Sequence, residues 1–97
     1  MAMETVREAL ERLVRMGYVD EFSADGEGLR SRATGAIAAP ETFRVDEIVR
    51  FEGESDPSDE SAIFALRSSG DGRRGTYTVA FGTLMDGADA EMVRRLR

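Results

Sequence analysis

The stretch from residue 62 to residue 81 constrains the fold most, because it contains two strand-like segments separated by a turn. Residues 76–81 alternate apolar residues with small or polar ones, and residues 68–74 are rich in Gly and Ser. This pattern predicts an antiparallel β-hairpin. The first strand is apolar on both of its faces, with Ala62, Phe64 and Leu66 on one and Ile63 and Ala65 on the other.

An amphipathic helix is predicted near the start of the chain. Thr5 and Glu8 have the spacing of a capping box, and Gly17 suits the left-handed residue that ends a helix. The apolar stripe at helical spacing consists of Val6, Ala9, Leu10, Leu13 and Val14. Two favourable i, i+4 pairs are expected on the outer face, Glu8 with Arg12 and Glu11 with Arg15.

A second helix is predicted at the other end, with Asp89 as its N-cap. Its apolar stripe is Met92, Val93 and Leu96. A helix of roughly two turns does not persist alone in water. We therefore expect this helix to dock on the sheet.

The middle of the chain is expected to supply the remaining strands. Residues 43–53 are predicted as a short turn and a strand in which Val45, Val49 and Phe51 share one face. Residues 23–28 are predicted as a turn, and residues 29–39 as one or two weak strands. Tyr18 and Phe22 are expected to anchor the core.

The order helix, strands, helix predicts one α+β domain over residues 1–97. We expect an antiparallel sheet of about four or five strands, with the N-terminal helix and the short C-terminal helix packed on one face.

The composition excludes several classes of functional site. The chain contains no Cys and no His, which rules out disulfides, thiolate or imidazole metal sites, and triads that use either residue. All 13 basic residues are Arg, so no Lys is present for a Schiff base.

The expected location is the cytoplasm, without a membrane partner. No apolar run reaches the roughly 18 residues that a membrane span needs. Glu4, Glu8 and Glu11 occupy the place where a signal peptide would have its apolar region.

The acidic balance predicts that stability depends on salt. The chain carries 19 acidic and 13 basic residues, a formal net charge of −6. An acidic chain without Lys suggests a GC-rich genome or a salt-rich cytoplasm. Because salt screens the self-repulsion of excess charge, we expect the melting temperature to rise between low and molar salt. Thermal melts across this range test the halophilic interpretation, which a flat or falling melting temperature would remove.

Two loop motifs resemble binding sites but have simpler interpretations. Residues 70–75 match the letters of the dinucleotide fingerprint, yet a strand instead of a helix is predicted after Gly75. Glycines at positive φ in a hairpin loop explain this motif. Five carboxylates within residues 52–60 could attract a hard cation, but their spacing is not that of a calcium loop. We therefore predict a solvated acidic loop, no metal site and no cofactor.

Four charged residues remain as candidates for a ligand or partner site. Arg50 and Glu52 share one face of the predicted strand, where they form either an exposed ion pair or the lining of a pocket. Arg73 and Arg74 could contact an anion at the hairpin loop. The negative net charge and the lack of an aromatic platform between the Arg clusters argue against nucleic acid as a partner.

Residues 43–53 carry the strongest part of a resemblance to a known family. Its further elements are Gly17-Tyr18, Ser55-Asp56-Pro57, Gly75, Gly82 and Glu91-Met92 with Leu96. The chain resembles a group of small uncharacterised bacterial proteins that are common in Bacteroidetes and their relatives. Members are often labelled phosphoribosylpyrophosphate synthetase. The residues here do not support that label, because the paired acids Asp46 and Glu47 lead into a strand instead of a phosphate loop.

The sequence therefore predicts a binding or interaction module with no evident catalytic residue. The face with Arg50 and Glu52 is the first candidate for contact with a protein partner, and an edge strand could also pair with a second copy. The alternative is a binder, or an enzyme, of a phosphorylated small metabolite. Its anion contacts would be Arg50, Arg73 and Arg74, provided that they converge on one pocket.

Overall fold

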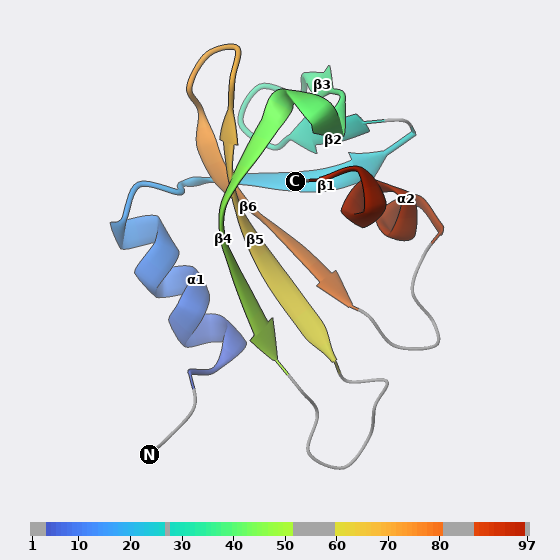
Figure 1. Cartoon of the computed structure of the whole chain (residues 1–97). Helices are drawn as coiled ribbons and strands as arrows, with labels where there is room; N and C mark the ends of the chain where they lie inside the picture. Colours follow the sequence, from blue (N-terminus) through green and yellow to red (C-terminus); the bar gives the residue numbers. More distant parts are fainter. Residues whose placement is uncertain (1–3, 27, 52–59, 81–86, 97) are drawn as a thin grey trace.

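The computed structural model of the chain describes residues 4–26, 28–51, 60–80 and 87–96 (Figure 1). The α+β class, the N-terminal helix and the hairpin are confirmed. In chain order the elements are α1 (Val6–Arg15), β1 (Asp20–Asp25), β2 (Gly28–Ser31), β3 (Ile37–Ala38), the 3-10 helix η1 (Pro40–Thr42), β4 (Phe43–Phe51), β5 (Ser61–Ser68), β6 (Arg74–Ala80) and α2 (Gly87–Arg95). None of the described helices is long and apolar enough to cross a membrane.

The sheet is larger than expected and it is mixed. Within the described residues it has six strands in the order β3-β2-β1-β6-β5-β4. All neighbours are antiparallel except β1 and β6, which run parallel where Asp20 lies opposite Gly75 and Glu21 opposite Thr76. The prediction of four or five antiparallel strands was therefore wrong. The turn expected over residues 23–28 is shorter than predicted, because Phe22 and Ala24 face the core and β1 extends as far as Asp25, opposite Gly28 at the start of β2.

The sheet must curl, because its two edge strands are almost consecutive in sequence. Ala38 ends β3 and Phe43 begins β4, and these five residue steps can span at most about 18 Å. In a flat sheet the outer strands of six would lie about 24 Å apart. The curl places Phe43 against Phe22 of β1, with ring centroids 4.9 Å apart.

The two helices pack on opposite faces of the sheet, which corrects the expectation of one covered face. Figure 1 shows α1 and α2 on either side of β4, β5 and β6. The α2 cluster contains Met92 and Leu96 and takes Ala62, Phe64 and Leu66 from β5. The α1 cluster contains Ala9 and Leu13 and takes Ile63 and Ala65 from the same strand. A strand that is apolar on both faces needs cover on both, and each helix supplies one.

A β-bulge at Asp46 changes which residues of β4 share a face. Val45 lies opposite Leu66 and Glu47 opposite Ala65, so Asp46 is an extra residue in β4. Val45 consequently packs against the α2 cluster, whereas Val49 and Phe51 pack against the α1 cluster. The prediction that these three residues share one face was wrong for Val45, since simple alternation does not hold across a bulge.

The expected helix signals are confirmed at both ends of α1 and wrong at the start of α2. Thr5 and Glu8 form the capping box, and Gly17 has a φ of 105°. Because Glu8 is used in the cap, Arg12 pairs instead with Glu4 and Glu47. Helix α2 starts at Gly87. Asp89 therefore lies inside the first turn, where it accepts a hydrogen bond of 2.5 Å from the Tyr77 hydroxyl.

Candidate functional site

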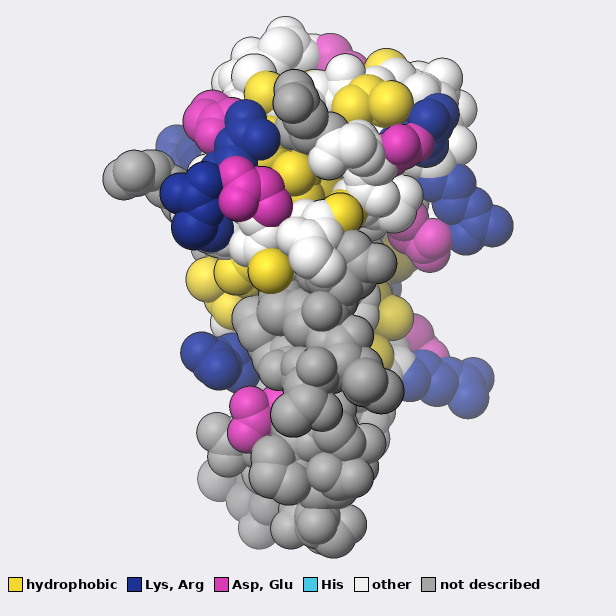
Figure 2. Space-filling view, turned by 90° about the vertical axis from the view of Figure 1, so that its right-hand side faces the viewer, with side chains coloured by type: hydrophobic (Ala, Val, Ile, Leu, Met, Phe, Trp, Pro, Cys, Tyr) yellow, Lys and Arg dark blue, Asp and Glu magenta, His cyan; other side chains and the backbone are white. Residues whose placement is uncertain are grey.

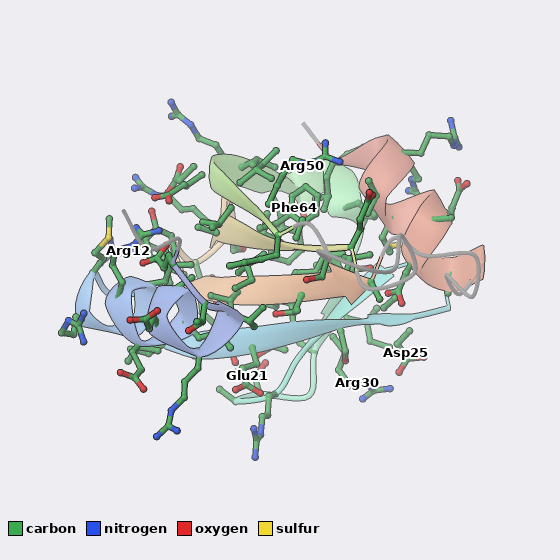
Figure 3. All side chains as sticks on the ribbon, turned by 90° about the horizontal axis from the view of Figure 1, so that it is seen from below. Arg12, Glu21, Asp25, Arg30, Arg50 and Phe64 are labelled. Carbon is green, nitrogen blue, oxygen red and sulfur yellow. The ribbon has the colours of Figure 1, made fainter. Side chains whose placement is uncertain are left out.

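The structure does not bring the three predicted arginines together. Arg50 lies opposite Ala62, which lies opposite Val79, so Arg50 is five residues along β6 from Arg74. This separation corresponds to roughly 17 Å. Figure 3 shows Arg50 beside Phe64, on the side of the sheet away from α1. Glu52, the predicted companion of Arg50, lies outside the described residues.

The side chains of Arg73 and Arg74 lie on opposite faces of the sheet. The Arg74 guanidinium carbon lies over the Tyr18 ring, 5.3 Å from its centroid, on the α1 side. This is cation–π distance. Any side chain at Gly17 would collide with Arg74, because an added Cβ would lie 2.3 Å from its Nη2. Arg74 is therefore part of the packing around Tyr18, whereas Arg73 lines a pocket on the α2 side.

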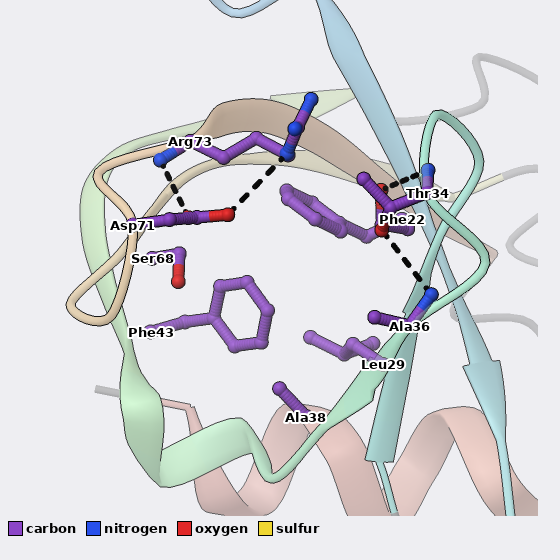
Figure 4. A pocket seen from close by; sticks show the side chains of 10 residues that line it. Phe22, Leu29, Thr34, Ala36, Ala38, Phe43, Ser68, Asp71 and Arg73 are labelled. Atoms are coloured by element: carbon purple, nitrogen blue, oxygen red, sulfur yellow. Dashed lines mark hydrogen bonds and ion pairs between the residues drawn. The ribbon is translucent and has the colours of Figure 1, made fainter.

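This pocket is half-open and lies where the curled sheet meets the β5–β6 loop (Figure 4). Its volume is about 70 Å³. We call it the Phe22–Phe43 pocket. Its lining consists of apolar Phe22, Leu29, Ala36, Ala38 and Phe43, together with polar Ser31, Thr34, Ser68, Asp71 and Arg73.

The local sequence explains why a pocket is left at this place. The Phe22 and Phe43 rings meet edge to face at 66°, and the small Ala36 and Ala38 leave space beside them. The β5–β6 loop turns at Gly72, which has a φ of 73°. The predicted hairpin loop is thus confirmed, and it holds Arg73 at the rim of the pocket.

A buried carboxylate stands behind the rim. The Asp20 side chain is 1% exposed. It accepts hydrogen bonds from the Ser31 hydroxyl at 2.5 Å and from the backbone N–H groups of Glu21 at 2.8 Å and Ala33 at 3.1 Å. Three donors therefore compensate for the burial of this charge.

Arg73 lies between two carboxylates without a hydrogen bond from its Nε. The Nε atom is 3.6 Å from Asp71 Oδ2 and 3.9 Å from Asp20 Oδ2. Both distances suit an ion pair but exceed hydrogen-bond length. The Nε–H group is buried and has no hydrogen-bond partner in the described structure. The pocket thus offers one unused donor.

The paired acids Asp46 and Glu47 are both occupied in holding α1 against β4. Arg12 donates to Glu4 and to Glu47, each at 2.8 Å, and these bonds raise the pKa of Arg12. The Tyr18 hydroxyl donates to Asp46 at 2.7 Å. This bond lowers the pKa of Asp46, with help from Arg67, and raises the pKa of Tyr18. Among the described residues, no cluster of three acids could hold a metal ion.

The Asp46 interaction predicts a loss of stability in acid. Because the folded pKa of Asp46 lies below its ordinary value of 3.8, its contribution is complete above that value and is lost as the pH falls through the folded pKa. Asp46→Asn keeps an acceptor for Tyr18 but removes the charge, so its stability should fall less steeply below pH 3.8. Urea unfolding from neutral pH into this range measures the slope. Glu11→Gln, in the exposed Arg7–Glu11 pair, is the control, and parallel slopes for Asp46→Asn and wild type would contradict the prediction.

Sequence reasoning singled out Arg73 as a candidate anion contact and Phe22 as a core residue, but it did not predict the pocket. Asp20 had a readable signal, because it shares the parity of Phe22 in β1 and so belongs to the buried face. No such sequence signal marked Ser31, Leu29 or Phe43 as pocket residues, since only the curl of the sheet brings them together.

Comparison of the chain with protein-family models, with curated proteins and with solved structures gave no match in any of the three.

Proposed function

We propose that the chain is a binding module that receives one apolar side chain of a protein partner in the Phe22–Phe43 pocket. The observation that carries this proposal is that the pocket has an apolar floor and a volume of only about 70 Å³. Pockets for drug-sized ligands have roughly 300–1,000 Å³. A volume of about 70 Å³ corresponds to roughly two water molecules in the liquid. Because the pocket is half-open, the end of a leucine side chain can enter it.

The surroundings of Arg73 support a protein partner over a phosphorylated metabolite. A phosphate site needs guanidinium groups whose charge is available, whereas Arg73 already lies within 4 Å of two carboxylates. Arginines and acids also lie side by side on the face that carries α2, as in the pairs Arg94–Glu91 and Arg95–Glu41 (Figure 2). The metabolite alternative further depended on a convergence of Arg50, Arg73 and Arg74, which the geometry does not provide.

The residue inventory also supports binding over catalysis. The chain has no His, Cys or Lys. Of the two serines in the pocket lining, Ser31 donates its hydroxyl hydrogen to the Asp20 carboxylate, which two backbone N–H groups also hold. The Ser68 hydroxyl accepts a hydrogen bond from the Gly70 N–H group. We extend the same proposal to the small bacterial proteins that the chain resembles. It replaces the synthetase label with partner binding.

Titration of the labelled protein with N-acetyl-leucine N-methylamide, followed by nuclear magnetic resonance, tests the proposal. Burying one leucine side chain contributes about 1.5–3 kcal/mol, so we expect a Kd in the millimolar to tens of millimolar range. The amide signals of Leu29, Ala38 and Phe43 should shift. Ribose 5-phosphate at the same concentrations should not shift them.

Leucine substitutions at two alanines of one loop provide the test variant and its control for this titration. Ala36 lines the pocket and is exposed, so Ala36→Leu should fill the mouth and abolish the shifts while the fold is kept. Ala33 is exposed outside the pocket, so Ala33→Leu should leave the titration unchanged. Shifts at Arg73 with ribose 5-phosphate alone, or no saturable shift with the leucine probe, would refute the proposed function.

A further inference from the structure

We infer that the Phe22–Phe43 pocket reads a neutral peptide carbonyl next to the apolar side chain, and hence a polypeptide segment instead of a C-terminal carboxylate or another acidic ligand. This inference rests on the proposed function. It names the chemistry of the partner that the pocket accepts.

The first observation is the unused donor in the wall of the pocket. Arg73 Nε is buried and makes no hydrogen bond, although Arg73 lines the same pocket as Phe22 and Phe43. A buried donor without a partner is unfavourable, and an acceptor that arrives with the ligand removes this cost. The backbone of a peptide carries a carbonyl oxygen next to each side chain, so an inserted residue brings the missing acceptor with it.

The second observation is the charge balance around that donor. One guanidinium group faces two carboxylates, Asp71 at 3.6 Å and Asp20 at 3.9 Å from Nε. Asp20 cannot turn away, because Ser31 and two backbone N–H groups hold it in a buried position. The site therefore has an excess of one negative charge. It repels an incoming carboxylate or phosphate and accepts an uncharged carbonyl.

The discriminating experiment compares two probes that differ only at the C-terminal group, the neutral N-acetyl-leucine N-methylamide and the carboxylate N-acetyl-leucine. We expect the carboxylate to bind the wild-type protein about tenfold more weakly. Asp71→Asn should narrow this difference. It removes one negative charge from a side chain that is 62% exposed, and the folded structure should tolerate the change.

Adjacent arginines provide the matched variants. Arg73→Met keeps the aliphatic stem but removes the donor, so it should weaken binding of the neutral probe about five- to tenfold. Arg74→Met changes the arginine that stacks on Tyr18 on the other face. It should leave the affinities of both probes unchanged.

The outcomes separate the two proposals. If the neutral probe does not bind, the proposed function fails. If it binds and the carboxylate binds as tightly or more tightly, the inference about the carbonyl fails while the proposed function stands. A neutral probe whose affinity is the same for Arg73→Met as for wild type would also overturn the inference.

Discussion

Leu13→Ala should destabilise the protein by about 2–5 kcal/mol, the cost of removing a fully buried leucine side chain. Leu13 is 0% exposed in α1 and belongs to the cluster with Tyr18, Ile63 and Ala65. This cluster is the apolar contact that holds α1 on its face of the sheet. Alanine would leave a cavity in this cluster. The α2 cluster lies on the opposite face of the sheet and cannot fill it.

Urea unfolding followed by circular dichroism measures this loss. Val14→Ala is the matched control, because Val14 is the next residue of the same helix and is 49% exposed. We expect its stability to stay within about 0.5 kcal/mol of wild type. A loss below about 1 kcal/mol for Leu13→Ala would show that α1 contributes little to the fold.

Gly75→Ala is expected to have the second-largest effect, because the parallel contact between β1 and β6 leaves no room for a side chain. An added Cβ would lie 2.5 Å from the Asp20 carbonyl oxygen and 2.8 Å from the Phe22 ring. Backbone atoms cannot move aside as a flexible side chain can, so β1 and β6 would have to separate. We expect a loss of about 2–3 kcal/mol, which corresponds to a fall in Tm of roughly 10–20 °C.

The control for this variant lies in the adjoining loop. At Gly70 an added Cβ would meet only Ser68 Oγ at 3.7 Å, an ordinary contact, so Gly70→Ala should melt close to wild type. Differential scanning calorimetry of the three proteins compares the midpoints. Equal midpoints for Gly75→Ala and wild type would mean that β1 and β6 are not in close contact.

The parts of the fold that could be predicted are those encoded by neighbouring residues. The capping box of Thr5 and Glu8 and the hairpin of β5 and β6 depend on short-range patterns, and both are confirmed. The parallel contact at Gly75, the bulge at Asp46 and the placement of the helices on opposite faces depend on contacts between distant segments. Periodicity reports which residues share a face of one strand but not which strand lies beside it.

The candidate site was likewise predictable only where neighbouring residues in the sequence encode it. Arg73 was predicted because it is a charged residue in a recognisable hairpin loop. Its partnership with Asp20 and Phe43 could not be predicted, since β1, β4 and the loop meet only after the sheet has curled. For Arg50 the sequence indicated a charged strand face, and the register then placed it far from Arg73 along the strands.

The shared strand β5 determines how the molecule opens. Its two faces belong to different apolar clusters, and it has β4 and β6 as neighbours on its two edges. Either helix can detach and expose only one face of β5, while the amide groups of the strand stay in their ladder hydrogen bonds. We therefore expect the amide hydrogens of β5 to exchange with solvent only when the whole sheet unfolds, and those of α1 and α2 to exchange through smaller local openings. In hydrogen exchange, β5 should be the slowest segment and should report the global free energy of unfolding.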